Sequence, residues 1–199
     1  MMRRRRGFTL VELLVIVAII GLLIGILMPA LGRAKTSARR TACATNLRQI
    51  GAGLRLYLDN NDDRFPFASF MPSISPEPLK TPKPIHIADV LAKELQGDRS
   101  VFHCPNDEPD PARGAPNTNL SYFQSERSSY EYRSFLGGRL LSRVIAELRE
   151  RIEARYPGRI VSENDLWLMR DYNNFHAPAG EPGARRYLYI DGHVADYQN

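Results

Sequence analysis

The sequence predicts an α+β fold in which one long N-terminal helix packs on a small, mostly antiparallel sheet. Residues 8–28 form an apolar run, and residues 29–60 continue with apolar side chains at three- and four-residue steps. The C-terminal half instead carries short alternating segments that are separated by turn residues. A chain of 199 residues is long enough for one compact domain with accessory segments.

The long helix is predicted from length and periodicity. A membrane-spanning helix needs about 20 apolar residues, and residues 8–28 supply 21 positions. Beyond them, Leu47, Ile50 and Leu54 recur at helical spacing among arginines and lysines, which is typical of an amphipathic helix. We therefore expect one helix from Phe8 to about Leu58, bent where Pro29 interrupts its hydrogen bonds.

The charge of the chain is concentrated at its N-terminus. Lys and Arg number 27 against 22 Asp and Glu, a formal net charge of +5, but four of the arginines are residues 3–6. The rest of the chain is close to neutral, so it does not favour nucleic acid as a partner, which requires a cationic face. A basic block directly before an apolar run indicates a membrane signal whose basic end stays in the cytoplasm. The residues after Gly32 are then extracytoplasmic.

Glu12 is the single charge between residues 7 and 32. An acid inside a membrane helix costs about 2.5–3.5 kcal/mol and usually marks a partner, although near a helix end it can also reach the interface. Its setting is Arg-Gly-Phe-Thr-Leu-Val-Glu-Leu-Leu over residues 6–14, followed by an unbroken apolar run.

This string resembles the N-terminal signal of type IV prepilins and of type II secretion pseudopilins. The resemblance implies cleavage between Gly7 and Phe8 by a prepilin peptidase, and then N-methylation of Phe8. Glu12 matches the acid at the fifth mature position of the family, and Pro29 falls where many pilins carry a kinking proline. The resemblance extends over roughly the first 60 residues.

The family implies a domain organisation and a function. Residues 1–7 are expected to be a basic leader, 8–28 a transmembrane helix, 29–60 its amphipathic continuation, and 61–199 an extracytoplasmic α+β domain. The chain is expected in the bacterial inner membrane as a single-pass protein and then in a filament. It is expected to be a structural subunit, not an enzyme, and its partners are other pilin-like subunits, the prepilin peptidase and the inner-membrane assembly platform.

The body should contain a short helix at 87–96, a strand at 101–105 and a polar, turn-rich segment at 105–128. A further strand is expected at 129–135, then a helix at 139–155 that Pro157 and Gly158 end. Three more strands are expected at 159–162, 166–171 and 186–190. Asp191 and Gly192 then predict a tight turn into a final strand at 193–197.

Two sets of residues in the body are candidate sites. Cys43 and Cys104 are either a disulfide, which an extracytoplasmic location permits, or two free thiols. Asp171, His176 and Asp191 could converge at one end of the sheet and bind a metal, with calcium as the candidate because some pseudopilins bind it near the C-terminus. The alternative is that Asp191 and Gly192 serve turn geometry alone.

His176 and the turn at Asp191 also resemble a C-terminal element of some bacterial prepilin-like proteins, in which a histidine precedes an Asp-Gly turn, usually by nine residues. Here fourteen residues separate His176 from Asp191, so this resemblance is loose.

Two other functions remain open at this point. The chain could be a minor or tip pilin that binds DNA, a surface or secreted cargo. It could also be an ordinary signal-anchored enzyme or solute-binding domain, which would leave the bond between Gly7 and Phe8 uncut.

Overall fold

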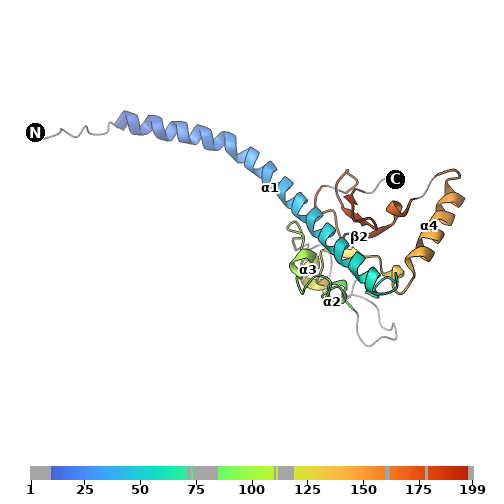
Figure 1. The fold of residues 1–199 in the computed structure, drawn as a ribbon. Coiled ribbons are helices and arrows are strands. Elements are labelled where there is room, and N and C mark those ends of the chain that lie inside the picture. Colours follow the sequence, from blue (N-terminus) through green and yellow to red (C-terminus); the bar gives the residue numbers. More distant parts are fainter. Residues whose placement is uncertain are drawn as a thin grey trace, which may run out of the picture. The chain divides into compact units, whose positions relative to one another are not determined.

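The computed structural model describes residues 10–70, 73, 85–109, 111, 119–159, 162–177 and 179–196. Its first element is helix α1, Leu10–Asn60, which is 51 residues long and continues through Pro29 (Figure 1). The long N-terminal helix is therefore confirmed. The chain divides into two units, one ending at Ala38 and one beginning at Arg39, and each is described by itself.

The N-terminal unit is the apolar part of α1. Every residue from Leu10 to Ala38 is exposed, and the exposed side chains include nearly all of its leucines, isoleucines and valines. By length and composition, α1 is able to cross a membrane. The described residues of this chain do not cover that apolar surface.

The second half of α1 provides one side of the core of the body. Cys43, Leu47, Ile50, Leu54 and Leu58 are fully buried. Their spacing places them on one helix face, as the sequence predicts. The compact body therefore begins at Arg39, within the helix.

The sheet provides the other side of the core. Strands β1 (Tyr130–Tyr132), β2 (Trp167–Asp171), β3 (Tyr187–Tyr189) and β4 (Val194–Ala195) pair in that order, and each pair is antiparallel. A register shift between Trp167 and Met169 marks a β-bulge. The α+β class and the C-terminal hairpin are confirmed.

The sheet has two chemically different faces, because side chains alternate along each strand. Tyr132, Met169 and Leu188 are neighbours in the register and are all buried in the core. Glu131, Arg170 and Tyr187 are also register neighbours and carry the charged and aromatic face. Because the bulge adds a residue, Trp167 lies with this second group, and its ring contacts both Tyr187 and Arg170.

The other helices are short apart from α4, Leu141–Arg155, which confirms the helix expected at 139–155 and buries Leu141, Val144 and Ile145. The remaining elements are α2 (Ile87–Val90), α3 (Tyr122–Glu126) and the 3₁₀ turns η1 (Ser100–Phe102), η3 (Ser134–Leu136) and η4 (Glu163–Asp165). The strand expected at 159–162 falls largely outside the described residues.

Two sequence predictions in the body are wrong. The helix expected at 87–96 ends at Val90, because i→i−3 hydrogen bonds, such as that from Ala92 N–H to the carbonyl of Asp89, interrupt the i→i−4 pattern after it. Gln96, at the expected end, has a positive φ of 54°. The strand expected at 101–105 is the 3₁₀ turn η1 followed by an extended residue. Asp98 stabilises that turn by accepting hydrogen bonds from the backbone N–H and the hydroxyl of Ser100.

The close contact of α1 with the sheet depends on a glycine. A Cβ atom at Gly51 would lie 2.8 Å from Cδ1 of Leu188, which is fully buried in the core. We expect Gly51→Leu to destabilise the body by about 1–3 kcal/mol through overpacking. The exposed neighbour provides a matched control, since Ala52→Leu should change stability by less than about 0.5 kcal/mol. Thermal unfolding of the full chain in detergent measures both, and equal effects of the two variants would refute this packing.

Candidate functional site

The structure describes only part of the N-terminal signal. Gly7 and Phe8, the predicted processing residues, lie outside the described residues. Glu12 lies in the first turn of α1, and Pro29 lies inside the same helix. The assembly role of Glu12 and the kink at Pro29 therefore stay predictions.

Cys43 and Cys104 are joined by a disulfide. Cys43 lies on α1, Cys104 follows η1, and both side chains are fully buried. Neighbouring hydrogen bonds connect the same two segments, since Asn46 Nδ2 donates to the carbonyl of His103 at 2.8 Å. The bridge therefore fastens α1 to the body across 61 residues of sequence.

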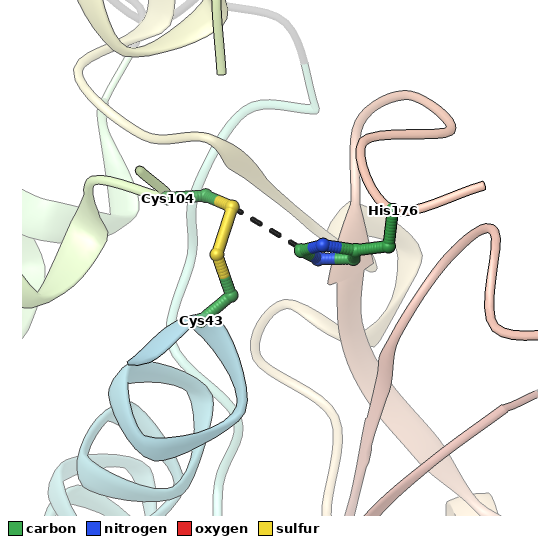
Figure 2. Close-up of side chains that lie close together, drawn as sticks. All are labelled: Cys43, Cys104 and His176. Carbon is green, nitrogen blue, oxygen red and sulfur yellow. Dashed lines mark hydrogen bonds between the residues drawn. A yellow bond between two sulfur atoms is a disulfide. The ribbon is translucent and has the colours of Figure 1, made fainter. Parts of the chain in front are cut away.

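The side chain of His176 packs against this disulfide. It comes from the segment after β2, and Figure 2 shows its ring pointing at the bridge, with Nε2 3.9 Å from Sγ of Cys104. Nε2 also lies 3.2 Å from Oδ2 of Asp171, and Nδ1 lies 3.1 Å from Nδ2 of Asn106. These contacts fit a neutral imidazole that donates from Nε2–H to the carboxylate and accepts at Nδ1 from the amide.

Asp171 is the buried acid of this group. Its Oδ2 accepts a hydrogen bond from the backbone N–H of Arg186 at 2.7 Å, in addition to the contact with His176. Its Oδ1 is buried and has no hydrogen-bond partner among the described residues. Burial raises the pKa of Asp171, and the contacts with His176 and Arg186 act in the opposite direction.

The predicted set of metal ligands is divided between two places. Asp171 and His176 are in contact, whereas Asp191 lies in the β3–β4 turn. There Oδ1 of Asp191 accepts the backbone N–H of His193 at 3.0 Å and lies 2.5 Å from its Nδ1. The binding of a metal by these residues stays a prediction.

Sequence reasoning missed two residues that hold this region together. The Arg40 guanidinium donates to the backbone carbonyl of His176, and Asn106 contacts both the ring of His176 and the carbonyl of Phe175. Neither residue belongs to a recognisable motif, because both act across long sequence separations. The one local indication was that Arg40 lies about one helical turn before Cys43 and so on a similar face of α1.

The charged and aromatic face of the sheet borders a cavity of about 490 Å³. The guanidinium of Arg133 lies 4.5 Å from the ring centroid of Phe135 and 4.3 Å from that of Trp167. The cavity is lined by Arg133, Leu148, Ile152, Tyr156, Arg159, Asn164, Asp165, Trp167, Tyr189, His193 and Ala195. Its walls combine the apolar side chains of Leu148 and Ile152 from α4, aromatic side chains of the sheet, and two arginines that lie just outside these elements.

The fold defines a pilin-like class of protein. It has a long N-terminal helix with an acid in its first turn, and the second half of that helix packs on a small antiparallel sheet. Residues 2–28 match the family model described as the prokaryotic N-terminal methylation motif. No solved structure matches the chain.

Two curated relatives extend this finding. The chain is 33% identical over 87 residues to the type II secretion system core protein G of Pectobacterium carotovorum, covering 40% of this chain and 54% of that protein. It is 33% identical over 66 residues to the type IV major pilin protein PilA of Myxococcus xanthus, covering 33% of this chain and 30% of that one. The chain thus spans about half the length of the first relative and less of the second. The resemblance to type IV pilins and type II secretion pseudopilins is confirmed.

The buried acid gives a pH dependence with a definite sign. Because the pKa of Asp171 is raised above its ordinary 3.8, the folded chain holds this proton more tightly than the unfolded chain does. The stabilisation from protonated Asp171 is fully present below the pKa of the unfolded chain. It is lost as pH rises through the higher pKa of the folded chain. We therefore compare the free energy of unfolding of the wild type with that of Asp171→Asn. The wild-type value minus the variant value should fall as pH rises above about 4.

Urea unfolding at a series of pH values measures this difference. Repeating the pair in a His176→Gln background removes the imidazole that contacts Asp171. Asp98→Asn is the control of opposite sign, because hydrogen bonds from Ser100 lower the pKa of that exposed acid. A difference for Asp171 that stays flat or grows with pH would contradict its placement.

Proposed function

We propose that this chain is a structural subunit of a type II secretion or type IV pilus filament, made as a membrane-anchored precursor. The main support for this proposal is the exposed apolar surface of residues 10–31. This surface begins within the segment that matches the methylation motif. Such a surface needs lipid or other helices around it. The membrane supplies the first environment, and neighbouring subunits supply the second.

Orientation follows from the basic leader. Arginines 3–6 remain in the cytoplasm and the body lies outside. The prepilin peptidase then cuts between Gly7 and Phe8, and the new amine of Phe8 is methylated. The Cys43–Cys104 bridge agrees with an extracytoplasmic body, because disulfides persist in oxidising compartments.

Glu12 sets the axial position of each subunit in this proposal. Cleavage creates a cationic amine at Phe8, and in a staggered bundle of helices that amine meets Glu12 of an adjoining copy. Breaking a buried pair by removing one partner typically costs about 3–5 kcal/mol, so the pairing favours one register. Methylation keeps the charge of the amine and therefore keeps the pair.

A second candidate is a minor or tip subunit that binds a partner. The cavity beside Arg133 and Trp167 favours it, because it offers cationic and aromatic groups on the face of the sheet away from α1. Position separates the two candidates. Immunogold labelling along whole filaments supports the structural subunit, and labelling confined to tips supports the binding subunit.

Intact-mass and N-terminal analysis of protein from membranes and from sheared filaments tests the main proposal. We expect a mature chain that lacks the first seven residues and begins with N-methylated Phe8. Gly7→Leu, which changes the last leader residue, should leave the full-length precursor in the membrane and none in filaments. A protein that keeps the arginines of its leader in every fraction would refute the proposal.

A further inference from the structure

The disulfide and two buried side chains next to it form a cluster of residue types that can bind a metal. We name it the Cys–His–Asp cluster, and it consists of Cys43, Cys104, His176 and Asp171. All four side chains are buried. The sulfur atoms of both cysteines and a ring nitrogen of His176 lie within 4.8 Å of one another, and Figure 2 shows how they face one another.

We propose that the Cys–His–Asp cluster is a redox-gated zinc site, in which the disulfide excludes the metal and the dithiol form binds it. Two thiolates, one imidazole and one carboxylate are a donor set that Zn²⁺ accepts in a tetrahedral arrangement. The separation of 61 positions between the cysteines explains why no paired spacing reveals this site in the sequence.

Two separations between donor atoms, both from the ring of His176, are close to those of a tetrahedral zinc site. Zinc bonds of about 2.3 Å to sulfur and 2.0–2.1 Å to nitrogen or oxygen place tetrahedral ligand atoms roughly 3.3–3.8 Å apart. Nε2 of His176 is 3.2 Å from Oδ2 of Asp171 and 3.9 Å from Sγ of Cys104. The proposal requires the two sulfurs, which are bonded in the disulfide, to separate to the same range after reduction by rotation of their side chains.

An independent observation at Asp171 also points to a ligand. Its Oδ2 faces the imidazole, whereas its buried Oδ1 has no hydrogen-bond partner among the described residues, so the carboxylate keeps an uncommitted oxygen. A bound cation would compensate the buried negative charge. Asn106 contacts the opposite ring nitrogen of His176 and holds the ring in place, as partners outside the ligand shell do in known zinc sites.

A phosphine is the reductant that converts the disulfide to the dithiol form. A phosphine reduces the disulfide to two thiols and becomes a phosphine oxide, taking its oxygen and the two thiol protons from water. Zn²⁺ then displaces both thiol protons. Oxidation by a disulfide such as oxidised glutathione removes two electrons from the thiolates, re-forms the Cys43–Cys104 bond and releases the metal.

The test uses the full chain in detergent, reduced with a phosphine and mixed with equimolar Zn²⁺ or Cd²⁺. We expect native mass spectrometry to show one Zn²⁺ per reduced chain and none per oxidised chain. Cd²⁺ should add thiolate-to-metal charge-transfer absorbance in the reduced chain only, and oxidised glutathione should abolish it. Zinc should raise the Tm of the reduced chain and leave that of the oxidised chain unchanged.

Matched variants separate this site from simple chelation by two thiols. His176→Gln should weaken zinc binding by the reduced chain at least about tenfold, and its disulfide form provides the check that the variant folds. His193→Gln changes an exposed histidine outside the cluster and should leave the Kd unchanged. Absence of equimolar binding by the reduced wild type would overturn the proposal, and so would equal affinity of the His176→Gln and His193→Gln variants.

Discussion

The constraint on which this structure depends is the division of one helix between two environments. From Arg39 to Asn60, α1 buries its apolar face against the body, and its stability there comes from tertiary packing. From Leu10 to Ala38 the same helix has every residue exposed. Lipid or other protein must cover its leucines, isoleucines and valines, so this half is defined by intermolecular contacts.

Three long-range connections join α1 to the rest of the body near Cys43. A disulfide, the bond from Arg40 to the carbonyl of His176 and the bond from Asn46 to the carbonyl of His103 lie within two turns of the helix. These contacts hold α1 to the rest of the body close to Arg39, where the body begins. Any load carried along a filament through the apolar half of α1 passes to the body at this place.

Local sequence patterns predicted those elements whose structure depends mainly on their own residues. α1 and α4 were predicted because their apolar positions recur at helical steps, and the C-terminal hairpin because Asp191 and Gly192 form a turn. Helix α3 was missed, although Ser121 and Gln124 form a capping box at its start. The strand expected near Val101 was wrong because Asp98 favours a 3₁₀ turn. The position of His176 against the disulfide could not be predicted, since it depends on three segments that meet only in the folded chain.

Assembly of the Glu12→Gln variant tests the central claim, that the apolar half of α1 is packed by neighbouring subunits in a register set by its one acid. Membrane fractions and sheared filaments are assayed for the same chain, with Thr9→Ser as a neighbouring control that keeps all charges. We expect Glu12→Gln to insert into the membrane at wild-type levels but to be lost from filaments, whereas the control assembles normally. Filaments of Glu12→Gln in wild-type yield and with wild-type subunit spacing would contradict it.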